Sequence, residues 1–136
     1  MDTILIVAPH PDDETLGCGG TILKHKKNGD KIYWLIVTEI NQNLGYSDEE
    51  IRMRTEEINK ISNFYEFHAV YKCGYPTTKL DALPMTDIVK KISGIFNEIN
   101  PNIVYLPFKN DIHTDHHKAF RLFPNHSLLN TACNDH

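Results

Sequence analysis

The sequence is poor in cysteine and has no excess of basic charge. Its three cysteines, at positions 18, 73 and 133, are widely spaced and form no C-x-x-C pair. This pattern argues against a disulfide framework or a thiolate metal site, and it suits a reducing, cytoplasmic compartment. Fourteen basic and eighteen acidic side chains give a net charge of −4. That charge disfavours general binding to nucleic acid or to an anionic membrane surface.

Long hydrophobic runs and internal repeats are also absent. The apolar run at residues 4–8 ends at Pro9, which makes it too short for a membrane span or for the apolar region of a secretion signal. With 136 residues, of which 40% are hydrophobic and 24% charged, the chain has the composition of one globular domain. Its eight histidines are unusual, because four of them fall in two tight clusters.

Strand-like and helix-like segments alternate along the chain. Continuous apolar runs predict strands, and amphipathic periodicity with helix start and stop signals predicts helices between them. The predicted strands are 3–8, 31–37, 68–72 and 102–106. The predicted helices are 15–27, one opened by the S-x-x-E capping box at 47–50, 88–99, and one from about 114. This order predicts an α/β fold, a Rossmann-like doubly wound parallel sheet of order 3-2-1-4 with helices on both faces.

Two clusters of metal-ligating residue types follow the first and fourth predicted strands. One is P-H-P-D-D-E at 9–14, and the other is N-D-I-H-T-D-H-H at 110–117. In a sheet of order 3-2-1-4 these strands are neighbours, and ligands bind beyond their carboxyl ends. Imidazole and carboxylate are the usual nitrogen and oxygen ligands of zinc. Three such ligands would leave a fourth position for water, as in a catalytic zinc site.

Each cluster also has a simpler interpretation. Asp12 and Asp13 could cap a helix N-terminus, and the histidines of 113–117 could form a solvated first helical turn. We favour the metal site because both clusters fall on the two loops that are expected to converge. The glycines at 17–20 lack the spacing of a nucleotide fingerprint and indicate close helix packing instead. The remaining histidines are isolated, and a surface or partly buried position explains them: His25, His68, His126 and His136.

At this point the sequence resembles a known family. Residues 4–22, I-L-I-V-A-P-H-P-D-D-E-T-L-G-C-G-G-T-I, are similar to the opening of the PIG-L/LmbE-like deacetylases. The family's second mark, H-x-D-H, is matched at 113–116, and its R-x-x-E helix resembles residues 54–57. The similarity runs from about residue 3 to about residue 121.

The resemblance implies a metal-dependent N-deacetylase with an N-acetylglucosaminyl conjugate as its small-molecule substrate. Asp12 would be the general base, His113 would stabilise the oxyanion or protonate the leaving amine, and Asp115 would hold the ring of His113. Arg54 would contact the substrate. Ferrous iron suits the same donors as zinc. The implied metal ligands are His10, Asp13 and His116.

The family's domain usually continues beyond the H-x-D-H helix. We expect residues 1–123 to form an incomplete deacetylase domain and residues 124–136, which begin with Pro124, to form an irregular tail. Either the reading frame would then be truncated or shifted, or the protein would be a natural short form. An uncovered fourth strand would favour self-association into a homo-oligomer. The alternative function is a non-catalytic or weakly active metal-binding remnant.

Overall fold

The chain folds around one four-stranded parallel sheet. The structure is a computed structural model and describes residues 1–8, 19–76 and 85–105. Its strands lie in the order β3-β2-β1-β4, and every pair is parallel. This confirms the predicted fold class and strand order. The strands are β1 (Thr3–Ala8), β2 (Lys31–Glu39), β3 (Ala69–Pro76) and β4 (Ile103–Tyr105).

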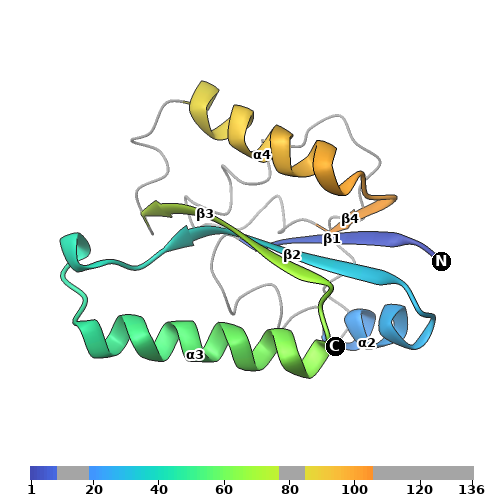
Figure 1. The fold of residues 1–136 in the computed structure, drawn as a ribbon, viewed down its shortest axis with the longest axis horizontal. Coiled ribbons are helices and arrows are strands. Elements are labelled where there is room, and N and C mark those ends of the chain that lie inside the picture. The colour runs from blue at the N-terminus through green and yellow to red at the C-terminus, as the bar shows by residue number, and fades with distance from the viewer. Residues whose placement is uncertain (9–18, 77–84, 106–136) are drawn as a thin grey trace.

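Helices cover both faces of the sheet. The α-helices are α2 (Gly19–Lys27), α3 (Asp48–Tyr65) and α4 (Met85–Ile99), and a short 3-10 helix, η1 (Gln42–Leu44), follows β2. Helices α2 and α3 lie on one side of the sheet and α4 lies on the other (Figure 1). The first four residues of the predicted helix 15–27, and the helix predicted from about 114, lie outside the described residues.

Alternate side chains of β1 supply the two hydrophobic cores. Residues 4, 6 and 8 pack on the side of α2 and α3, where they meet Ile22 and Ile58. Leu5 and Val7 pack on the opposite side, where they meet Ile88 and Ile92 of α4. Because both faces of β1 are covered, its sequence is a continuous apolar run rather than an alternating one.

Helix α2 packs closely against α3, as the glycine-rich sequence indicates. A Cβ atom built on Gly19 would lie 3.0 Å from the Tyr65 hydroxyl oxygen. This confirms the close-packing interpretation at Gly19. At the other end, Gly29 has a φ of 79°, which is the left-handed conformation expected just beyond a helix C-terminus.

Strand β3 is longer than the predicted strand 68–72 and contains an irregularity. Ile36 pairs with Lys72 and Thr38 pairs with Tyr75, so the register advances by one more residue on β3 than on β2. Gly74 lies in this bulge with a φ of 79°. The glycine allows the strand to accommodate an extra residue and continue to Pro76.

Candidate functional site

The carboxyl ends of β1 and β4 lie side by side. Ile4, Leu5 and Ile6 of β1 pair with the three residues of β4, and Tyr105, the last of them, is opposite Ile6. The chain therefore leaves two adjacent parallel strands at the same edge of the sheet to enter residues 9–18 and 106–136. These two segments carry both motifs.

The motif side chains themselves lie outside the described residues. In the described part of the chain, no group of three or more His, Cys, Asp or Glu side chains could hold a metal ion. The predicted metal ligands and catalytic residues thus remain predictions. They are His10, Asp12, Asp13, His113, Asp115 and His116.

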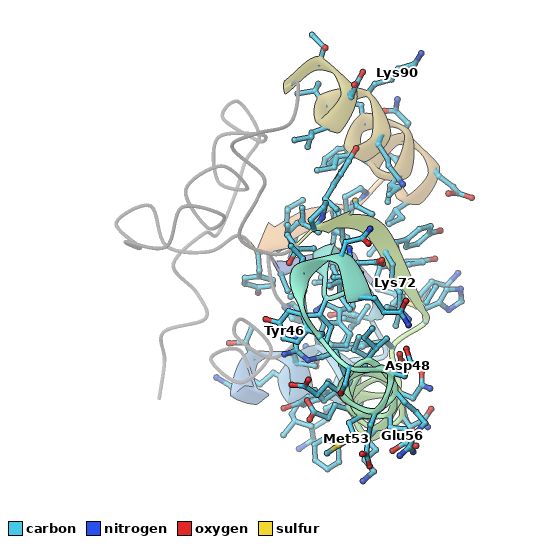
Figure 2. The ribbon with its side chains drawn as sticks, turned by 90° about the vertical axis from the view of Figure 1, so that its left-hand side faces the viewer. Tyr46, Asp48, Met53, Glu56, Lys72 and Lys90 are labelled. Atoms are coloured by element: carbon cyan, nitrogen blue, oxygen red, sulfur yellow. The ribbon has the colours of Figure 1, made fainter. Side chains whose placement is uncertain are left out.

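A pocket of about 110 Å³ opens beside the same edge, at the end of β2. Strand β2 contributes the buried Thr38 and the exposed Glu39 to its wall, and β3 contributes the exposed Lys72. Figure 2, which looks from the carboxyl-end side of the sheet, shows Lys72 at the level of the strands and Met53 and Glu56 on the outer side of α3. The β-bulge next to Lys72 is a feature that is common beside functional sites.

Helix α3 brings Arg54 to this pocket. Ile51, Arg54, Thr55 and Ile58 all line it, and their spacing places them on one side of a helix. The helix begins with the predicted capping box, because the Ser47 hydroxyl accepts from the Glu50 N–H while the Glu50 carboxylate accepts from the Ser47 N–H. Hydrogen bonds to the Glu50 carboxyl from the Ser47 backbone N–H, and secondly from the Ser47 side chain, lower the pKa of Glu50.

Two arginines of α3 have different surroundings. Arg52 is exposed and pairs with Glu49 at 3.7 Å and with Glu56 at 2.8 Å. Arg54 is half-buried at the pocket and makes no ion pair or hydrogen bond with any residue in the described ranges. Its guanidinium is therefore a candidate donor to a ligand in this pocket.

The sequence predicted a substrate-binding role for Arg54, which lines this pocket, and predicted no role for the neighbouring residues of the lining. Thr38, Glu39 and Lys72 reach the pocket through the pairing of β2 with β3 and the bulge between them. The available signal was the position of Thr38 and Glu39 at the end of a parallel strand, where ligands usually bind. A second, open hollow of about 300 Å³ shares Glu39, Ile40 and Ile51 with the pocket and extends along residues 41–43.

The fold and the edge of the sheet at the carboxyl ends of its strands define a class of protein. It is an open, parallel α/β protein, a class in which ligands usually bind at the point where the strand order reverses. Residues 5–126 match the family described as PIG-L, GlcNAc-PI de-N-acetylase. The chain belongs to this family.

Individual relatives include named deacetylases. A diacetylchitobiose deacetylase of Thermococcus kodakarensis is 28% identical over 126 residues, covering 85% of this chain and 45% of that protein. A probable N-acetyl-α-D-glucosaminyl L-malate deacetylase of Bacillus cereus is 26% identical over 122 residues, covering 83% and 55%. The structure of N,N'-diacetylchitobiose deacetylase from Pyrococcus horikoshii matches with a TM-score of 0.74 and 25% identity, covering 89% of this chain and 47% of that one. The chain spans about half the length of these relatives.

No helix within the described ranges is both long and apolar enough to cross a membrane. The described Cys73 is a free, buried thiol. Burial raises the pKa of this thiol to about 11.

Proposed function

We propose that this protein is a metal-dependent deacetylase that removes the acetyl group from an N-acetylglucosaminyl conjugate. One observation carries the proposal: the motif at 9–14 directly follows β1, the motif at 110–117 lies in the segment that follows β4, and these two strands are adjacent and parallel. Family membership and the names of the relatives support the same reaction class. The free thiol of Cys73 suits the cytoplasmic location that we propose for the chain.

The donor set fits a divalent ion. His10, Asp13 and His116 would supply two imidazoles and one carboxylate, which suit zinc or ferrous iron. The pairing of the strands that precede them supports their convergence. A divalent ion held there would polarise the amide carbonyl and lower the pKa of a water molecule.

The protein's own residues would then carry the proton transfers. Asp12 would take a proton from the attacking water, since a carboxylate beside the ligands can reach it. His113 would stabilise the oxyanion or give a proton to the leaving amine, and Asp115 would fix the tautomer of His113. Arg54, at the pocket beside β2, would bind the sugar conjugate. The products would be acetate and a free amino sugar.

The first experiment separates the metal ligands from the general base. Purified protein is analysed for bound zinc or iron and assayed for acetate release from N,N'-diacetylchitobiose and from an N-acetylglucosaminyl malate. His10→Ala and His116→Ala should lose the metal, whereas Asp12→Asn should keep it and lose acetate release. His68→Gln, at an exposed histidine outside both motifs, is the matched control and should behave as wild type. Full activity in Asp12→Asn would overturn the mechanism.

The same assay tests the alternative. A wild-type chain that binds one metal ion but releases no acetate from either substrate would be a metal-binding remnant rather than an enzyme. Acetate release that depends on the metal would exclude that alternative.

Arg54 offers a paired test of substrate binding. Arg54→Ala should raise KM about tenfold, with a smaller change in kcat, because a hydrogen bond from a charged donor is lost from the bound substrate. Arg52→Ala removes a similar side chain from the same helix, but Arg52 pairs only with surface carboxylates in the described region. It should leave KM unchanged. If both substitutions raised KM equally, Arg54 would not be a substrate-binding residue.

A further inference from the structure

Helix α2 and strand β4 are joined by a buried polar network that the proposed chemistry does not use. On α2, the Nδ1 atom of His25 lies 2.7 Å from an Asp30 carboxylate oxygen, and its Nε2 atom lies 2.7 Å from the Tyr105 hydroxyl. The side chains of His25 and Asp30 are only 15% and 6% exposed, and Tyr105 is 5% exposed. We call these three residues the His25 clamp.

The hydrogen-bond directions in the His25 clamp follow from its partners. An ionised carboxylate only accepts, so Nδ1–H of His25 donates to Asp30. With its proton on Nδ1, the ring accepts at Nε2 from the Tyr105 hydroxyl, whereas a ring that also carried a proton on Nε2 would donate to that hydroxyl oxygen. Asp30 also accepts from the backbone N–H of Asp2 at 2.8 Å. The hydrogen bond from Asp2, followed by that from His25, lowers the pKa of Asp30. The carboxylate therefore stays ionised at neutral pH and fixes the tautomer of His25.

The position of the His25 clamp in the chain relates it to both motifs. Helix α2 begins directly after residues 9–18, which carry His10 and Asp13. Strand β4 ends directly before residues 106–136, which carry His116. Asp30, through Asp2, also holds the chain at the start of β1. The clamp thus links the elements that flank the two halves of the proposed metal site.

We propose that His25 is a positioning residue, which holds α2 against β4 so that the two motif segments present their metal ligands in one fixed geometry. This inference rests on the proposed function. Metal sites require ligands held within about 0.5 Å of the productive geometry. Groups behind the ligands that maintain this geometry typically change metal affinity about 10- to 100-fold when they are removed.

Two variants, which remove different amounts of the His25 clamp, test its role. Tyr105→Phe removes only the hydroxyl, and His25→Ala removes the ring. The dissociation constant for zinc is measured by competition with a chelating indicator, and the visible absorption of the cobalt(II)-loaded protein reports ligand geometry independently of turnover. We expect the zinc dissociation constant to rise about tenfold in Tyr105→Phe and more in His25→Ala, with altered cobalt absorption. Circular dichroism and urea unfolding verify that each variant is folded under the conditions of the titration.

The matched control removes a hydrogen bond that joins two other elements of the fold. Lys91 of α4 donates to the backbone carbonyl of Cys73 in β3 at 2.7 Å, and neither element directly adjoins a motif segment. Lys91→Met should lower stability but leave the zinc dissociation constant and the cobalt spectrum unchanged. Equal loss of zinc affinity in Lys91→Met and Tyr105→Phe would show a general effect of destabilisation and overturn the proposal.

The remaining outcomes are also distinguishable. Wild-type zinc affinity in both folded clamp variants would overturn the positioning role of His25 but leave the proposed function intact. A wild-type chain that binds zinc without releasing acetate would refute the proposed activity, and the affinities of the variants would still decide the role of the clamp. A wild-type chain that binds no metal would refute both proposals.

Discussion

The charge on Asp30 stabilises the fold through hydrogen bonds that only the ionised form can accept fully. Its carboxylate accepts from the backbone N–H of Asp2 and from His25, and its pKa is lowered from the ordinary value of 3.8. A carboxyl whose folded pKa lies below its unfolded pKa contributes stability at every pH above the unfolded value. This contribution is lost as the pH falls through the lower folded pKa.

Asp30→Asn should therefore lower the free energy of unfolding at neutral pH. It should also make that free energy depend less on pH in the acid range. The single amide oxygen can replace only one of the two accepting oxygens, because the Asp2 N–H bonds to Oδ1 and His25 Nδ1 bonds to Oδ2. The difference from wild type at neutral pH therefore reflects the charge together with one hydrogen bond that the ionised carboxylate accepts. This difference should shrink as the pH falls below 3.8 and towards the lower pKa of Asp30 in the folded protein, where the wild-type carboxyl becomes protonated. Urea unfolding of both proteins at a series of pH values measures this difference in stability. Glu57→Gln, at an exposed carboxyl of α3, is the control and should retain the wild-type profile. A constant difference at all pH values would contradict the role assigned to the charge.

At the scale of the elements, the capping box should contribute measurably to α3. Ser47→Ala removes the hydroxyl that accepts from the Glu50 N–H at 3.1 Å, and one of the unpaired N–H groups of the first turn then loses its partner. We expect a loss of about 1 kcal/mol in the free energy of unfolding. The urea midpoint measures this, with an unchanged denaturant slope as evidence that the unfolding transition is the same.

Ser93→Ala provides the comparison for the capping substitution. Ser93 is an exposed residue within α4, and alanine has the higher helix propensity. This variant should be neutral or slightly more stable than the wild type. Equal destabilisation by Ser47→Ala and Ser93→Ala would mean that the capping box contributes nothing specific.

The elements also differ in how well their sequence predicts them. The strand at 3–8 and the helix starting at Asp48 were predictable because an apolar run and a capping box are local signals. The extension of β3 to Pro76 was not predictable from the sequence. A glycine usually indicates the end of a strand, whereas Gly74 occupies a bulge within β3 at a φ of 79°. In α4, the apolar residue Val89 is 39% exposed. Its neighbour Ile88 faces the sheet, and successive residues on a helix point about 100° apart.

At the scale of the whole molecule, contacts between distant residues set the limit of prediction. His25 and Tyr105 are 80 positions apart, and nothing in the local sequence distinguishes His25 from the other isolated histidines. Lys72 reaches the pocket only because β3 pairs with β2 across the bulge. The strand order could be predicted, because parallel crossover rules leave few topologies. The side chains that the topology brings together could not.

The last prediction concerns the stability of the whole fold. The proposed ligands come from segments that follow β1 and β4, so an unfolded chain has no preformed site and metal binding adds directly to the free energy of folding. At a free zinc concentration about 100 times the dissociation constant, the gain should be about 2.7 kcal/mol. Thermal unfolding should shift upward by about 10 °C for a domain of this size.

Scanning calorimetry with zinc, and then with excess chelator, measures this shift. His10→Ala and His116→Ala should each abolish it, whereas His68→Gln should retain it because that exposed histidine lies outside both motifs. Since His10 and His116 belong to segments that leave two adjacent strands, loss of the shift in both variants would show that one ion links them. If zinc stabilised His10→Ala as much as the wild type, the stabilising ion would bind elsewhere, and the assignment of His10 as a ligand would be wrong.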